Sequence, residues 1–180
     1  MAAKDTRVAL IRGINVGRAK RVAMADLRKI IEKLGYTDVR TLLNSGNVVF
    51  QATSAKGAAE RIERGLERLG VPARVVVLDA ADLQTIVKQN SLAADDRNPS
   101  RLMVAIPIES KPGLAKLQGL LKEDWSPDVL AFGTKAAYFW IPEGLLESKL
   151  AKAIMRTHGE GFTVRNWATI SKLHALCESD

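Results

Sequence analysis

The sequence has little of the chemistry on which most metal and nucleophile sites depend. Its 180 residues include one cysteine, Cys177, and two histidines, His158 and His174. A single cysteine forms no intrachain disulfide, and neither histidine has a partner at metal-ligand spacing. We therefore expect no metal centre, no Cys–His catalytic pair and no bound cofactor.

Long apolar runs are also missing. The chain has no stretch of about 18 apolar residues, which argues against a membrane span. Residues 1–5 lead directly into a strand-like segment and lack the apolar core of a secretory signal. Together with the single cysteine, these features predict a cytoplasmic protein that does not contact a membrane.

Acidic residues are scarce in one half of the chain only. Residues 1–90 hold 16 Lys/Arg against 9 Asp/Glu, whereas residues 91–180 hold 11 of each, so the first half carries the entire net charge of +7. Four of these cations lie close together with no acid between them: Arg12, Arg18, Lys20 and Arg21. Such a segment can attract phosphates or other anions, and the alternative is a solvated loop that aids solubility.

The apolar pattern predicts the same series of elements twice. In the first half, strands are expected at 6–11, 39–43, 48–50 and 73–78, with helices at 27–34, 62–69 and 83–87. After a polar stretch at 90–100, strands are expected at 102–108, 129–132, 136–141 and 162–164, with helices at 112–121, 146–154 and from 166 onward. The helix expected at 112–121 carries Leu114, Leu117 and Leu121 on one face.

Both halves thus have the order β-α-β-β-α-β-α. Helix-bridged strands form crossovers and short turns form hairpins, and a split βαβ sheet satisfies both constraints. The predicted fold is α+β, with two tandem ferredoxin-like βαββαβ(α) halves at residues 1–90 and 101–180.

The most distinctive segment is Arg12-Gly13-Ile14-Asn15-Val16-Gly17-Arg18, between a predicted strand and a predicted helix. Glycines at such a position let backbone N–H groups approach an anion, and the arginines add positive charge. The segment is not a P-loop, because its glycines are too close and no Lys-Ser/Thr pair follows. Alternatively, the glycines supply only the dihedral angles of a turn.

Two further segments carry polar groups of interest. Asn44-Ser45-Gly46-Asn47 could bind a ligand through its amides and hydroxyl, although these residues also suit a hairpin turn alone. Ser45 lacks the G-x-S-x-G elbow of a nucleophile. Asn166 suits the N-cap of the last helix and Trp167 a packing anchor, which leaves Arg165 unexplained. The predicted ligand-binding residues are Arg12, Gly13, Asn15, Gly17, Lys20, Ser45, Asn47, Arg165 and Asn166.

Aromatic residues are too few, and wrongly placed, for RNA binding on a sheet surface. A βαββαβ sheet that binds RNA stacks bases on aromatics of its first and third strands. In the first half the first strand has no aromatic residue and the third has only Phe50, whereas Tyr138 and Trp140 lie on the electrically neutral half. Nucleic acid binding of this type is therefore disfavoured.

The three polar segments resemble a bacterial family of uncharacterised proteins, DUF1697. The matching residues are Leu10 to Gly17, Ser45 to Phe50, and Arg165-Asn166-Trp167 with Thr169, in the same order over nearly the whole chain. The family commonly has a second glycine where Arg18 stands, and often Gln where Asn44 stands. The resemblance implies a two-part fold of ferredoxin-like halves, and it brings no established activity, cofactor or catalytic residue.

The leading hypothesis is that the protein binds a small anionic ligand, a nucleotide or phosphorylated metabolite. The ligand is expected at the basic Gly loop, where Asn47 and Arg165 join it. One alternative is an enzyme of unidentified reaction at the same cleft, and another is a module that binds nucleic acid or protein. The sequence does not indicate an oligomeric state.

Overall fold

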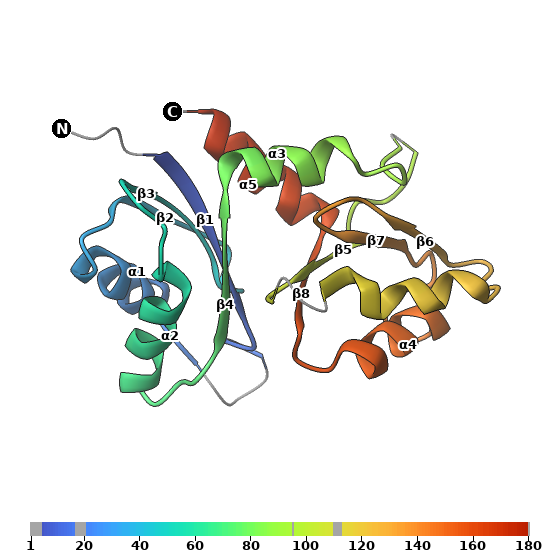
Figure 1. The fold of residues 1–180 in the computed structure, drawn as a ribbon, viewed down its shortest axis with the longest axis horizontal. Helices are drawn as coiled ribbons and strands as arrows, with labels where there is room; N and C mark the ends of the chain where they lie inside the picture. The colour runs from blue at the N-terminus through green and yellow to red at the C-terminus, as the bar shows by residue number, and fades with distance from the viewer. Residues whose placement is uncertain (1–4, 17–20, 95, 110–112, 180) are drawn as a thin grey trace. The chain divides into compact units, whose positions relative to one another are not determined.

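A computed structural model describes residues 5–16, 21–94, 96–109 and 113–179, and for His158 the backbone alone. The chain forms two compact units, drawn in Figure 1. The first unit comprises Met1–Leu83 and Leu173–Asp180, and the second comprises Gln84–Lys172. Both divisions fall inside helices. The halves predicted from the sequence, 1–90 and 101–180, were placed by the repeated order of strands and helices, so their boundaries differ from those of the two units.

The first unit is built on a four-stranded antiparallel sheet with the order β2-β3-β1-β4. Its elements are β1 (Asp5–Arg12), α1 (Met24–Lys33), β2 (Thr37–Leu42), β3 (Asn47–Ala52), α2 (Ala58–Arg68) and β4 (Arg74–Asp79), followed by α3 (Ala80–Lys88). Because β3 lies between β1 and β2, the β1–α1–β2 crossover is split. The ferredoxin-like topology predicted for this half is confirmed.

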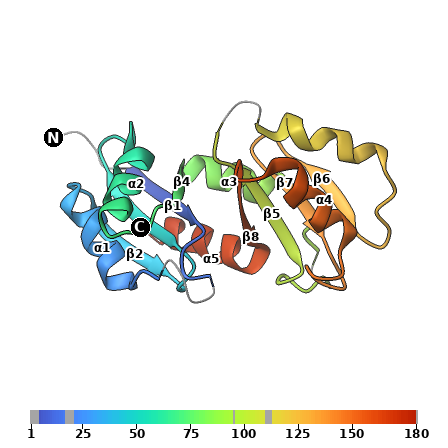
Figure 2. The ribbon, with the colours of Figure 1, turned by 90° about the horizontal axis from the view of Figure 1, so that it is seen from below.

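The core of this unit lies between the sheet and helices α1 and α2, which occupy one side of the sheet in Figures 1 and 2. Strands β1 and β3 contribute Ala9, Ile11, Val48 and Phe50, and the helices contribute Leu27, Ile31, Ile62 and Leu66. Residues 8–11 of β1 are all fully buried, so both faces of this central strand are covered. The strand that leads into the Gly loop is therefore rigidly held.

The second unit repeats the arrangement, with the strand order β6-β7-β5-β8. Its elements are β5 (Leu102–Pro107), η1 (Gly113–Lys122), β6 (Val129–Phe132), β7 (Ala137–Trp140), α4 (Lys149–His158) and β8 (Phe162–Asn166), followed by α5 (Trp167–Glu178). Its core joins side chains of η1 and α4 to the sheet, among them Leu117, Leu150, Phe139 and Phe162. The second ferredoxin-like half is confirmed as well.

The helix expected at 112–121 differs from the prediction. Within the described residues it is a 3-10 helix, η1, and Pro112 lies outside them. A period of three residues turns Leu117 and Leu120 inward, whereas Leu121 is 56% exposed. Gly113 and Gly119 weaken the preference for an α-helix in this segment. The predicted apolar face was therefore wrong at its last position.

The aromatic residues of β7 take part in packing. Tyr138 is fully buried, and its hydroxyl donates to the backbone oxygen of Ile86 at 2.7 Å. Trp140 lies under the guanidinium of Arg97, 5.3 Å from the ring centroid. The ring of Tyr138 is thus unavailable as a platform for stacking bases.

The buried phenol predicts a measurable pH dependence. Burial raises the pKa of Tyr138 to about 12, against about 10 in an unfolded chain. Above about pH 10 the unfolded state therefore releases the proton more readily, and this contribution to stability is lost as the pH rises toward about 12. We expect Tyr138→Phe to cost about 1 kcal/mol at neutral pH, because Ile86 loses a donor. Urea unfolding of both proteins should show this difference shrinking in alkali, and a constant difference would contradict it.

Candidate functional site

The connection from β1 to α1 turns away from the sheet through two residues in the left-handed region. Gly13 has φ 79° and Asn15 has φ 57°. Between them Ile14 is only 2% exposed, so its side chain anchors the loop in the core. Glycine adopts this region without strain, and asparagine enters it more readily than most other residues. Gly13 thus does supply turn geometry, as one of the two interpretations of this loop required.

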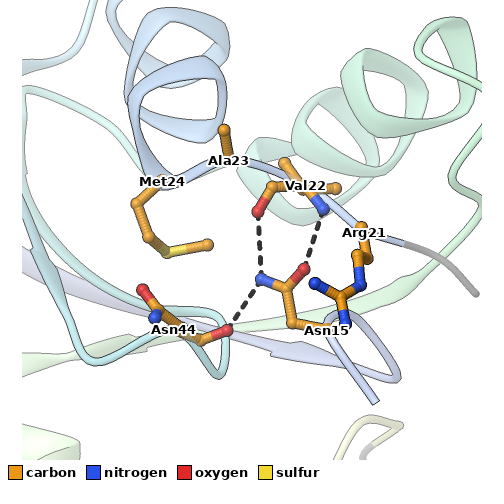
Figure 3. Close-up of a pocket in the computed structure, with 6 residues that line it drawn as sticks. All are labelled: Asn15, Arg21, Val22, Ala23, Met24 and Asn44. Atoms are coloured by element: carbon orange, nitrogen blue, oxygen red, sulfur yellow. Dashed lines mark hydrogen bonds between the residues drawn. The ribbon is translucent and has the colours of Figure 1, made fainter. Parts of the chain in front are cut away.

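The side chain of Asn15 joins three segments of backbone. Its Nδ2 donates to the backbone oxygen of Val22 at 3.0 Å and to that of Asn44 at 2.7 Å, and its Oδ1 accepts from the Val22 N–H at 2.8 Å. Figure 3 shows the amide between these partners. The amide pairs with Val22 as a peptide group would in a sheet. It therefore fixes the residues just before α1 against the β2–β3 hairpin.

The hairpin turn is packed onto the same loop. The N–H of Ile11 donates to the oxygen of Gly46 at 2.8 Å, and Gly46 has φ 78°. Asn47 is fully buried, and its Nδ2 donates to the oxygen of Leu42 at 3.0 Å and to Oγ of Ser45 at 2.9 Å. The side chain of Asn47 thus holds the turn together.

A pocket of about 480 Å³ opens where the loop, the hairpin and α1 meet (Figure 3). Its lining residues are Asn15, Arg21, Val22, Ala23, Met24 and Asn44. Ala23 is the N-cap of α1 and has no side-chain oxygen to accept from the first turn. Because the first N–H groups of a helix lack partners within it, such a terminus favours anions. The exposed guanidinium of Arg21 adds positive charge to the wall.

The structure brings some of the predicted ligand-binding residues together and separates others. Asn15 lines the pocket with Asn44, whereas Ser45 and Asn47 contact each other inside the turn. Arg12 ends β1, partly buried, opposite Arg74 of β4. Gly17 and Lys20 lie outside the described residues.

Arg165 and Asn166 belong to the second unit, where both have local partners. Arg165 Nη1 donates to Oγ1 of Thr163 and to the oxygen of Val164, both at 2.9 Å. Asn166 Oδ1 accepts from the N–H of Thr169 at 2.9 Å and from its hydroxyl at 2.8 Å. The N-cap predicted for Asn166 is therefore confirmed.

Several lining residues were absent from the predicted set. Arg21 belongs to the cluster of four cations and Asn44 to the polar hairpin turn. Val22, Ala23 and Met24 have apolar side chains that point to no ligand chemistry. Their common feature is position, because they form the entry into α1. The one sequence signal for them is the missing cap at the start of the helix, because alanine has no side-chain oxygen to accept from the first turn.

Metal binding and acid–base chemistry depend on particular side chains among the described residues. No group of three or more His, Cys, Asp or Glu that could hold a metal ion occurs among them. Among the described residues, a shifted pKa occurs at Tyr138 and at Asp124, both in the second unit. The pKa of Asp124 is lowered by hydrogen bonds from the backbone and side chain of Ser126. In the part of the chain that the structure describes, no helix is both long and apolar enough to cross a bilayer.

The fold defines an α+β protein made of two consecutive ferredoxin-like halves. The chain belongs to the DUF1697 family, described as proteins of unknown function, whose sequence model matches residues 5–138. The resemblance seen in its three polar segments is thereby confirmed.

Solved structures that match this chain include those of two proteins. The conserved bacterial protein SP0830 from Streptococcus pneumoniae has a TM-score of 0.79 at 23% identity, over 97% of this chain and 99% of that one, and shows the same fold. An unknown protein from Galdieria sulphuraria aligns over 91% of this chain and 97% of that one, at 13% identity and a TM-score of 0.28. No curated protein matches the chain.

Proposed function

We propose that the protein binds a small anionic ligand, a nucleotide or phosphorylated metabolite, in the pocket beside Asn15. The observation that carries this proposal is the meeting of Arg21 with the uncapped start of α1 on a pocket of about 480 Å³. That volume lies within the range of about 300–1,000 Å³ that is usual for small-molecule sites. The single cysteine is consistent with a place in the cytoplasm.

Three features of the pocket would each serve an anion. The start of α1 offers backbone N–H groups, since Ala23 provides no capping oxygen. Arg21 offers a planar set of donors suited to phosphate. The hydrogen bonds of Asn15 keep the wall in one conformation without a ligand, which lowers the entropy lost on binding.

Calorimetric titration with AMP, glucose 6-phosphate and inorganic phosphate tests the proposal. We expect at least one organic phosphate to bind, and Arg21→Gln to weaken that binding about tenfold, because one charge-assisted hydrogen bond is lost. Arg28→Gln is the matched control, since Arg28 is exposed on α1 and does not line the pocket. Equal affinities for the two variants, or no binding of any probe to the wild type, would refute the proposal.

A further inference from the structure

We propose that the groove between α1 and α2 is a second ligand site, and that it takes a small organic anion with two or more phosphate groups. This α1–α2 groove has a volume of about 370 Å³ and lies wholly within the first unit. Four cations line it, Lys33 from α1 and Arg61, Arg64 and Arg68 from α2, with no acidic residue among the lining residues. None of the nine ligand-binding residues predicted from the sequence belongs to it.

The arginines lie together because of their spacing on the helix. Positions 61, 64 and 68 are separated by three and four residues, which places them on one face of α2. Glu60 and Glu67 stand four residues before and three residues after Arg64, but neither acid lines the groove. Glu63 turns to β4, where its Oε1 accepts from the N–H of Val75 at 2.8 Å and lies 3.4 Å from Nε of Arg74. The positive charge therefore gathers on the side of α2 that faces α1.

Three of these cations have no neutralising partner. Within the residues that the structure describes, the side chains of Lys33, Arg64 and Arg68 form no hydrogen bond, ion pair or ring contact. All three are exposed at the groove. An acid three or four residues away can reduce such repulsion on a helix, but among the described residues neither Glu60 nor Glu67 forms an ion pair with Arg64. A ligand that brings negative charge would relieve it here.

The fourth cation is held ready at the groove. The Nη2 of Arg61 donates to the hydroxyl of Tyr36 at 2.6 Å and to the oxygen of Lys56 at 2.9 Å. The guanidinium also lies 5.6 Å from the centroid of the Tyr36 ring. These contacts fix its position, so that less side-chain entropy would be lost when a ligand binds.

The floor of the groove indicates an organic part in the ligand. Ile30, Leu34 and Leu69 line it, and Leu69 is 50% exposed. The helices touch at its base, because a Cβ built on Gly65 would lie 2.5 Å from Cγ2 of Ile30. Four cations balance about two phosphates, each of which carries a charge near −2. A small organic polyphosphate matches both the charge and the apolar floor.

A single-stranded nucleic acid fits the groove less well. Proteins that bind such strands combine a basic groove with exposed aromatic rings on which bases stack. The lining of the α1–α2 groove contains no aromatic residue, and the nearby Tyr36 is only 7% exposed. The groove therefore offers contacts to phosphate but no platform for bases.

Calorimetric titration with ATP and with inorganic tripolyphosphate, at about physiological salt, tests the second site. In the Arg21→Gln background, which weakens the pocket beside Asn15, we expect both probes to bind, and the added pair Arg64→Gln/Arg68→Gln to weaken their binding at least tenfold. The control is Arg28→Gln/Lys29→Gln, which removes the same charge from α1 outside the groove. Glutamine is as good a helix former as arginine, so all variants should keep the wild-type unfolding midpoint.

The two sites are separable by their variants. Arg21→Gln leaves the α1–α2 groove intact, so weaker binding of AMP or glucose 6-phosphate by this variant would concern the pocket beside Asn15 alone. Equal binding by the groove variant and its charge-matched control would overturn the second site. So would tighter binding of a thymidine oligonucleotide than of ATP, lost in the groove variant and steeply weakened by salt, because that result would make the groove a nucleic-acid contact.

Discussion

Gly46→Ala should lower the free energy of unfolding by about 3 kcal/mol. Two costs combine at this position. The backbone has φ 78°, and an L-residue there is strained by about 1–2 kcal/mol. A Cβ would also lie 2.9 Å from both Cβ and the backbone oxygen of Ile11. Overpacking against a fixed strand costs about 1–3 kcal/mol.

Gly70→Ala separates the two costs. Gly70 has a similar φ of 74°, but nothing lies within 4 Å of a Cβ built on it. Its substitution should therefore cost only about 1 kcal/mol, the price of backbone strain alone. Urea unfolding at neutral pH measures both variants against the wild type. Similar losses of stability in the two variants would show that Gly46 is not packed closely against Ile11 of β1.

Asn15→Asp should destabilise the first unit by about 2–3 kcal/mol at neutral pH. The substitution keeps the oxygen that accepts from the Val22 N–H but replaces the donor nitrogen by a second carboxylate oxygen. That oxygen would face the backbone oxygens of Val22 and Asn44, which now lie 3.0 Å and 2.7 Å from Nδ2. Two hydrogen bonds are lost and an ionised group is set against two carbonyl dipoles.

Acid should reverse part of this loss, because a protonated carboxyl regains one donor. Folding would raise the pKa of the carboxyl at position 15, because its ionised form faces two carbonyl oxygens. The variant therefore gains stability relative to the wild type as the pH falls. Asn15→Gly is the second comparison, since it keeps the left-handed backbone and removes the whole side chain. The measurement is the free energy of unfolding of the three proteins at neutral and mildly acid pH. A difference between wild type and Asn15→Asp that does not change with pH would contradict the hydrogen bonds described for Asn15.

The order of elements could be predicted because their local signals agree. The β-branched run at 75–77 gives a strand, and the apolar spacing of Leu27 and Ile31 gives a helix whose inner face is indeed buried. The 3-10 helix escaped prediction because its period of three residues cannot be told from an α-helical one when leucines recur at 114, 117, 120 and 121.

The candidate sites depended more on contacts between distant parts of the chain. Asn15 could be selected for its setting among glycines, but its bond to Asn44 joins positions 29 apart and has no sequence signature. Asn47 has the same polar character, but its side chain is buried within its own turn. The spacing of Arg61, Arg64 and Arg68 was visible, whereas their position facing α1 follows only from the packing of the two helices.

The contact between Gly65 and Ile30 limits which substitutions α1 and α2 can accept. A methyl group at position 65 meets Cγ2 of Ile30, and that atom cannot move aside because it branches directly from Cβ. Alanine at 65 therefore becomes acceptable only when position 30 loses its branch, as it would with leucine or methionine. The space between the helices holds either the branch at position 30 or a methyl group at position 65. In related chains that keep the helices equally close, the two positions should therefore vary together.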